Sequence, residues 1–296
     1  MKSYHDIASD GGSNVLEQVS VQRKHLEERL ADVRHIVAVA SGKGGVGKST
    51  VTACLASALN RKGYAAGVLD ADLNGPSMAH MMGVQDHIPY SRDDAMTPAL
   101  SHGRIPIMSM DLFLPPGSTP VIWQAPTQRG AYTWRSMVEM SALRELLADT
   151  HWGTLDIMLV DLAPGADKLQ NLADLLPNIS GTLIVTTPTA VAQMVVGRSI
   201  TMASDVAQVP VIGLVENMSG NTCRRCGHEE ALFTGNPAAH KLAQRHDIAY
   251  LGRIPFDARL AYCLDEGISF LKDYPESTAG KAILSIADAL HAWLDL

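Results

Sequence analysis

The glycine-rich stretch SGKGGVGKST, residues 41–50, follows the apolar run HIVAVA (35–40) and precedes a helix-like stretch, VTACLASALNRKG. A strand, a glycine-rich turn and a helix start are the setting of a phosphate-binding loop, or P-loop. Glycines let backbone N–H groups converge on phosphate oxygens because no Cβ blocks the approach. The segment therefore predicts an α/β chain that binds a nucleotide.

The polar residues of this loop have distinct expected roles. Lys48 should reach the β- and γ-phosphates, and the Ser49 hydroxyl should ligate Mg²⁺. A glycine-rich turn without a ligand would not need the strand, the spacing, the lysine and the hydroxyl together. The residues predicted to bind ATP are Gly42, Lys43, Gly44, Gly45, Val46, Gly47, Lys48, Ser49 and Thr50.

Apolar, β-branched runs alternate with helical stretches along the rest of the chain. The predicted strands are 35–40, 65–70, 104–110, 155–161, 182–187, 209–216 and 249–254, and the predicted helices are 48–62, about 136–150, 189–206 and 236–246. Such runs are typical of parallel strands covered by helices on both faces. They predict a doubly wound α/β fold whose ligand lies beyond the carboxyl ends of the strands.

Residues 1–34 are predicted to form a polar tail and a helix, ahead of a P-loop ATPase domain over residues 35–296. Asn14 fits a helix N-cap, with Glu17 three residues later. Apolar residues then keep helical spacing at Leu16, Val19, Leu26, Leu30 and Val33. We expect this helix to pack on the main domain; docking of a partner is the alternative.

The bulk composition excludes several classes of protein. The chain has 296 residues, 46% of them hydrophobic, and can bury a large core. A net charge of −7 argues against broad nucleic-acid binding. The sequence shows neither an apolar window long enough for a membrane helix nor a secretory signal. Four cysteines are too few for a disulfide framework, so we expect a cytoplasmic protein without membrane or nucleic-acid partners.

Three carboxylates are predicted at strand ends close to the P-loop. Asp70 and Asp72 lie in LDADLNGPS (69–77), and Asp161 ends LDIMLVD (155–161). Asp161 is placed where an acid would hold the Mg²⁺ shell. A single strand-end aspartate is often only a turn cap, but three beside a P-loop indicate a hydrolytic Mg²⁺–nucleotide site.

SGKGGVGKST resembles the deviant Walker A motif of the MinD/ParA/nitrogenase-iron-protein superclass, whose signature is an extra early lysine, here Lys43. The resemblance implies that two nucleotide-bound subunits face each other and that Lys43 stabilises transition-state charge on the partner's phosphates. It also implies that Asp72 positions the attacking water. The predicted catalytic residues are Lys43, Lys48 and Asp72.

Cys223 and Cys226 form a C-x-x-C turn in NTCRRCGHEE. Tetrahedral zinc or a [4Fe–4S] cluster needs four ligands, and one such turn supplies two. Cys54 is interpreted as a core residue and Cys263 as core or helix surface, so two copies of the chain would complete the set. A bridging iron–sulfur cluster ranks first, structural zinc second and a redox disulfide third.

From about residue 35 to 270 the chain resembles the Mrp/ApbC family of ATP-binding iron–sulfur carriers. The resemblance rests on SGKGGVGKST, LDADLNGPS, VIWQAP, WGTLDIMLVDLAPG, IVTTP, GLVENMS, CxxCG and LGRIPFD. It implies a homodimer that binds ATP, holds a labile [4Fe–4S] cluster between CxxC pairs and passes it to apo-proteins. It also implies that Asn217 and Pro255 lie around the adenine.

The chain departs from that family at several positions. Trp123-Gln124-Ala125-Pro126-Thr127 replaces W-R-G-P-M, and DLAPGADK (161–168) ends in Lys168 where a carboxylate is usual. Thr189 replaces a glutamine and Val195 an aspartate. The pattern predicts retained nucleotide and metal binding, with either slow, attenuated hydrolysis or a specialised client. Neutral drift in surface loops is the alternative.

Two other branches of the superclass give alternative interpretations. A MinD/ParA-like switch acting on a partner would leave the CxxC structural or redox-active. A MinD-type membrane helix is basic, whereas the C-terminal stretch 281–296 carries Asp288 and Asp295, so its stripe is expected to pack in the core. That stripe consists of Ile283, Ile286, Leu290 and Trp293. An electron donor like the nitrogenase iron protein takes its cluster cysteines singly from separated positions.

Overall fold

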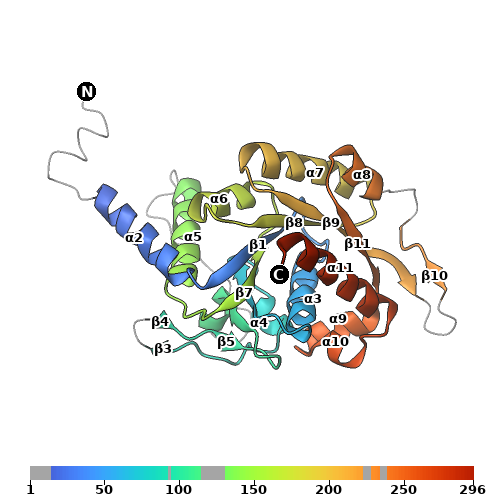
Figure 1. Cartoon of the computed structure of the whole chain (residues 1–296), viewed down its shortest axis with the longest axis horizontal. Helices are drawn as coiled ribbons and strands as arrows, with labels where there is room; N and C mark the ends of the chain where they lie inside the picture. The colour runs from blue at the N-terminus through green and yellow to red at the C-terminus, as the bar shows by residue number, and fades with distance from the viewer. Residues whose placement is uncertain (1–14, 93–94, 115–130, 223–227, 234–238) are drawn as a thin grey trace.

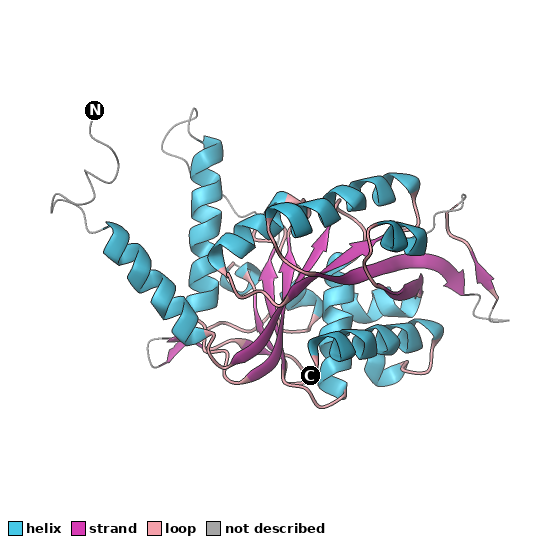
Figure 2. Cartoon of the chain, turned by 45° about the horizontal axis from the view of Figure 1, so that its top comes forward, coloured by secondary structure: helices cyan, strands magenta, loops and turns pink. Residues whose placement is uncertain are grey.

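The computed structural model describes residues 15–92, 95–114, 131–222, 228–233 and 239–296. These residues form a nine-stranded, mostly parallel sheet between two layers of helices (Figures 1 and 2). The predicted doubly wound α/β fold is confirmed.

The sheet is ordered β10-β9-β8-β1-β7-β2-β6-β5, and β11, which is off this path, pairs with β9 in parallel. Its parallel strands are β1 (Val33–Ser41), β2 (Ala66–Ala71), β6 (Pro106–Met108), β7 (Leu155–Leu162), β8 (Gly181–Thr186), β9 (Val211–Thr222) and β11 (Tyr250–Phe256). Antiparallel pairing adds β5 (Ala99–Leu100) to β6 and β10 (Glu229–Glu230) to β9. A separate pair consists of β3 (Ser91–Arg92) and β4 (Ala95–Met96).

The strand that precedes the P-loop lies in the middle of the sheet. β1 pairs with β7 on one side and with β8 on the other, and its last six residues are buried. The chain passes from β1 to β2 on one side and later from β7 to β8 on the other. Ligands of open α/β sheets bind at such a switch point, beyond the carboxyl ends of the strands.

The helices form two groups on opposite sides of the sheet (Figure 2). The first group consists of α3 (Lys48–Arg61), α4 (Met78–Met81), α9 (Ala258–Asp265), α10 (Phe270–Asp273) and α11 (Thr278–Leu294). The second consists of α6 (Asp167–Leu175), α7 (Ala190–Thr201), the π-helical turn η3 (Met202–Val206) and α8 (Ala239–Arg245). α2 (Val15–Arg29) packs beside α5 (Ala131–Ala148), and a 3₁₀ turn, η1 (Met110–Phe113), follows β6.

The N-terminal helix is confirmed, but its predicted end is wrong. α2 ends at Arg29, and Val33 is the first residue of β1, because its backbone pairs with Leu155 of β7. Leu26 and Leu30 are buried as expected, whereas Val19 is 57% exposed. Arg29 Nε donates to Ala148 O at 3.0 Å, so the helix packs on the domain as predicted. Asn14 lies outside the described residues.

The C-terminal helix α11 packs on α3 and β11. Ile283, Ile286 and Leu290 are fully buried, which confirms the core interpretation of the apolar stripe. Trp293 is 42% exposed and was wrongly placed in that core. Within the described part of the chain, no helix is both long and apolar enough to span a bilayer.

Candidate nucleotide-binding site

The P-loop joins Ser41 at the end of β1 to Lys48 at the start of α3. Gly45 and Gly47 have φ of 77° and 79°, in the left-handed region that favours glycine. A Cβ at Gly47 would also lie 2.1 Å from Asn217 Nδ2. Glycine is therefore required at position 47 for both backbone conformation and space.

Asp161 at the end of β7 binds the first turn of α3. Lys48 Nζ lies 2.7 Å from Asp161 Oδ2, and Ser49 Oγ donates to the same oxygen at 2.7 Å. Thr52 Oγ1 donates to the other oxygen, Oδ1, at 2.7 Å. Lys48 is 6% and Asp161 1% exposed, so the loop lysine and the strand-end acid form a buried ion pair.

The oxygen atoms beside the P-loop fit a magnesium ion. Mg²⁺ prefers hard oxygen ligands, usually one or two from the protein together with phosphate and water. The Ser49 hydroxyl and the Asp161 carboxylate supply such atoms at one edge of the sheet, next to the loop glycines. With ATP bound, the ion would neutralise charge on the phosphates there.

Asp70 lies opposite Asp161 in the register of β2 and β7. Its Oδ2 accepts hydrogen bonds from the amides of Ser77 and Met78 and from Ser109 Oγ. Burial raises the pKa of Asp70 to about 7, and the charge of Asp161 adds to the effect. The strand-end position was predicted correctly, but both carboxyl oxygens of Asp70 bind this chain's own groups and fix the segment that leads into α4.

Asp72 and Lys43 are the two residues predicted to act on the reacting phosphate. Asp72 follows β2, is half-buried, and accepts from the Gly75 amide at 3.2 Å. Its own amide donates to Asp70 Oδ1 at 3.1 Å. Lys43 is half-buried and forms no ion pair with any residue that the structure describes.

Asn217 and Pro255 lie on neighbouring strands, since Asn217 of β9 is opposite Ile254 of β11. Asn217 is 4% exposed, and its Nδ2 donates to Val46 O at 2.9 Å. Asn217 therefore contacts the P-loop itself. Pro255 is buried next to this pair.

The positions that depart from the family pattern have identifiable contacts. Lys168 Nζ lies 3.2 Å from Glu139 Oε2, and Asn74 Nδ2 donates to the other oxygen of Glu139. Thr189 caps α7 by accepting from the Ala192 amide. Val195 packs against Gly42, because a Cβ at Gly42 would lie 2.7 Å from its Cγ1. Residues 123–127 lie outside the described residues.

The family is decided by a match over residues 32–291 to the ParA family model described as "NUBPL iron-transfer P-loop NTPase". The chain belongs to this family. An iron–sulfur cluster carrier protein from Methanococcus maripaludis is 36% identical over 88% of this chain and 86% of its own length. The one from Escherichia coli K12 is 38% identical over 93% of this chain and 71% of its own.

Solved structures agree with this assignment. A nucleotide-binding protein from Archaeoglobus fulgidus in complex with ADP has a TM-score of 0.70 and 34% identity, and the match covers 83% of this chain and 91% of that one. The cell division ATPase MinD from Pyrococcus furiosus, at 19% identity and a TM-score of 0.58 over 88% of this chain and 99% of that one, shares the fold.

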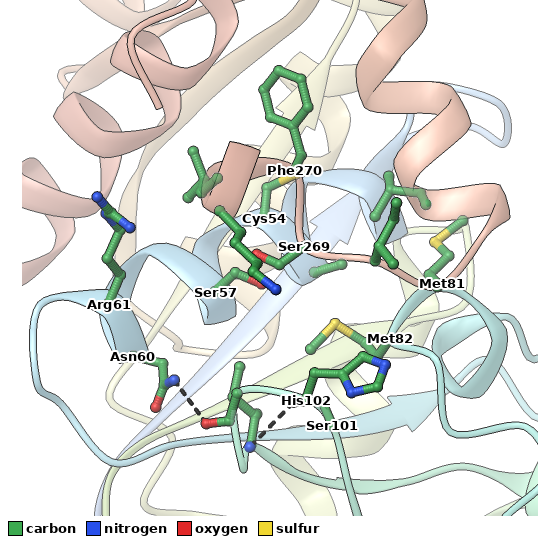
Figure 3. A pocket seen from close by; sticks show the side chains of 18 residues that line it. Cys54, Ser57, Asn60, Arg61, Met81, Met82, Ser101, His102, Ser269 and Phe270 are labelled. Atoms are coloured by element: carbon green, nitrogen blue, oxygen red, sulfur yellow. Dashed lines mark hydrogen bonds between the residues drawn. The ribbon is translucent and has the colours of Figure 1, made fainter. Parts of the chain in front are cut away.

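Cys54 and Cys263 of this chain are both buried, which confirms Cys54 as core and places Cys263 there as well. Burial raises the pKa of the Cys54 thiol to about 12, with the nearby Cys263 adding to the effect. Cys54 lies on the wall of a cavity of about 340 Å³ between α3, α4 and α10, whose lining includes no P-loop residue (Figure 3).

Cys223 and Cys226 lie outside the described residues, between Thr222 and Glu229, which pair at the junction of β9 and β10. The described residues include no group of three His, Cys, Asp or Glu side chains placed to hold a metal ion.

Three contacts of this site were missed from the sequence: Thr52 to Asp161, Ser109 to Asp70, and Asn217 to Val46. Thr52 carries a local signal, since it lies four residues after Lys48 on the same helix face. Ser109 and Asn217 carry none, because strand pairing brings them to the site from distant parts of the chain.

Proposed function

We propose that this chain is an ATP-binding iron–sulfur carrier that works as a homodimer. Cys223 and Cys226 of each copy bridge one [4Fe–4S] cluster between the two subunits, and the cluster is passed to apo-proteins. The names of the relatives support the class of cargo. A mouse relative, 36% identical over 87% of this chain and 91% of its own length, is a cytosolic Fe-S cluster assembly factor, so we propose the cytoplasm as the location.

The observation that carries this proposal is the position of β9. Asn217, within β9, binds the P-loop carbonyl of Val46. The same strand ends at Thr222, the residue before Cys223. One continuous strand therefore joins the phosphate loop to the cysteine segment, and a movement of the loop would be transmitted along it. In Figure 1, β9 runs past α8 and β11 toward β10 at the edge of the molecule.

The P-loop residues divide the work on ATP in this proposal. Lys48 binds the β- and γ-phosphates, and Ser49 and Asp161 hold Mg²⁺. Lys43 reaches the phosphates of the partner subunit, and Asp72 orients the attacking water. Asn217 and Pro255 border the adenine. Slow hydrolysis fits the pairing of Lys168 with Glu139, because the family resemblance implies a carboxylate at position 168.

The requirement for two copies follows from the supply of thiolates. A [4Fe–4S] cluster takes four cysteine ligands. The buried Cys54 and Cys263 cannot reach a cluster at the edge of the fold without unfolding α3 and α9. Each chain therefore supplies two thiolates, from Cys223 and Cys226, and two chains supply the four that the cluster needs.

Anaerobic reconstitution with iron and sulfide tests the proposal. Wild type is compared with Cys223→Ala/Cys226→Ala and with Cys54→Ala/Cys263→Ala, which removes the same number of thiols from the core. We expect about four irons per two chains, with a broad visible absorbance, in wild type and in the core variant. The CxxC variant should stay colourless. Iron retained in that variant, or a wild type that holds zinc alone, would contradict the proposal and leave a nucleotide-switched dimer with a structural or redox CxxC.

A further inference from the structure

A groove of about 770 Å³ lies between α7, η3 and α8, which are adjacent in the second layer of helices (Figure 1). We call it the α7–α8 groove. Its walls include Gln193, Met194, Arg198 and Val206 on one side and Lys241 and Arg245 on the other. None of these side chains takes part in the nucleotide site or in the cysteine segment.

The charge of the groove is opposite to that of the chain. Arg198, Lys241, Arg245 and His246 line it, and no Asp or Glu is among the described residues of its lining. The whole chain carries a net charge of −7. A local concentration of cations on an acidic protein favours an anionic occupant and speeds its approach.

The groove also exposes apolar side chains. The side chain of Met194 is 61% exposed and that of Val206 is 50% exposed, so both present apolar surface to solvent. Methionine side chains adapt to varied apolar partners. Val206 lies in the π-helical turn η3, a form of helix found often at functional sites.

Gln193 adds an unsatisfied polar group to the groove. Its Nε2 is buried and has no hydrogen-bond partner among the described residues. A buried donor without an acceptor is costly, and rotation of this side chain toward an oxygen acceptor in the groove would relieve that cost.

We propose that the α7–α8 groove docks an acidic amphipathic helix of a partner protein. Helical walls that carry both cations and exposed apolar side chains suit a helix that presents apolar residues on one face and carboxylates beside it. A lipid surface is disfavoured because the cations line a hollow rather than a projecting face. The inference does not depend on what the protein carries.

The groove is linked to the P-loop through α7. Helical spacing places Met194 and Arg198 on one face of α7, and Val195 and Ser199 on a neighbouring face about 100° round the helix. A Cβ at Gly42 would lie 2.7 Å from Val195 and 3.0 Å from Ser199 Oγ, so the second side packs directly on the loop residue before Lys43. The docking surface is therefore on a helix that contacts the nucleotide loop.

The test uses the purified full-length chain and a fluorescent, stapled helical peptide with leucines on one face and glutamates beside them. A matched peptide carries lysines in place of the glutamates. Binding is measured by fluorescence anisotropy for wild type, Arg198→Glu/Arg245→Glu, Met194→Ser, and the control Arg23→Glu/Lys24→Glu. The control makes the same charge change at exposed positions of α2.

We expect the glutamate peptide to bind wild type and the α2 control alike, and both groove variants at least tenfold more weakly. The lysine peptide should not bind. Circular dichroism checks that each variant is folded. Equal binding to wild type and groove variants, or no binding of the glutamate peptide, would overturn the proposal. It would also be overturned if Arg198→Glu/Arg245→Glu lowered the mass measured by light scattering, because the groove would then be covered by a second copy.

Discussion

Asp161 is the side chain on which the P-loop, its helix and the central sheet converge. It accepts hydrogen bonds from Ser49 and Thr52 and pairs with Lys48, and it is 1% exposed. A buried carboxylate is stable only while such partners compensate for its lost hydration. The site is therefore held in place by contacts between side chains of α3 and the end of β7.

The pH dependence of stability should report on Asp70. Its pKa is about 7 in the folded chain against 3.8 in the unfolded one, so the folded chain keeps a proton that the unfolded chain releases. This contribution to the free energy of unfolding is complete below the unfolded pKa and is lost as pH rises through about 7. Relative to Asp70→Asn, which does not titrate, wild type should lose stability as the pH rises from about 4 to about 7.

Urea denaturation of both proteins without nucleotide measures this difference. A gap between wild type and Asp70→Asn that stays constant with pH would show that Asp70 is ionised throughout.

Asn217 tests the link between β9 and the P-loop. Asn217→Ala leaves Val46 O without its buried donor, and we expect a loss of about 1–3 kcal/mol in the free energy of unfolding. Asn217→Asp should cost more, because a carboxylate oxygen would then face the Val46 carbonyl. Both variants should bind Mg²⁺–ADP more weakly by calorimetry. Variants within about 0.5 kcal/mol of wild type would exclude this role for the side chain.

At the scale of elements, a serine occupies the N-cap position of both α10 and α11, and the two can be compared. Ser277 caps α11 by accepting from the Gly280 amide at 3.0 Å, whereas Ser269 precedes α10 without such a bond. Ser277→Ala should lower the free energy of unfolding by about 1 kcal/mol, and Ser269→Ala by much less. Thermal unfolding of the two variants gives the comparison, and equal losses would show that α11 does not depend on its cap.

The elements also show what can be predicted from the sequence. β1, β7 and β8 were located within about two residues, because buried parallel strands are continuous apolar runs. The P-loop was recognised because its roles are local. α2 was extended too far, since Val33 keeps helical spacing but its backbone pairs with β7. The Asn217–Val46 contact joins residues 171 apart in the chain, and no local pattern predicts it.

At the scale of the whole molecule, the role proposed for Lys43 requires a dimer. Lys43→Ala should bind Mg²⁺–ATP as wild type does but turn it over about a hundredfold more slowly, because a transition-state cation supplied in trans is lost. Lys48→Ala should lose nucleotide binding itself. Wild-type turnover per chain should rise with protein concentration. Single-turnover assays check this, and a Lys43→Ala rate within about twofold of wild type would place Lys43 outside the chemistry.

Cluster transfer is the measurement that tests the account most directly. The reconstituted protein is mixed anaerobically with apo-aconitase, and aconitase activity is followed with and without Mg²⁺–ATP, with a chelator present to capture free iron. We predict that activity returns with wild type and with Cys54→Ala/Cys263→Ala, and that the Cys223→Ala/Cys226→Ala variant restores none. If the chelator abolishes activation, or if the CxxC variant activates as well as wild type, the protein is not a cluster carrier.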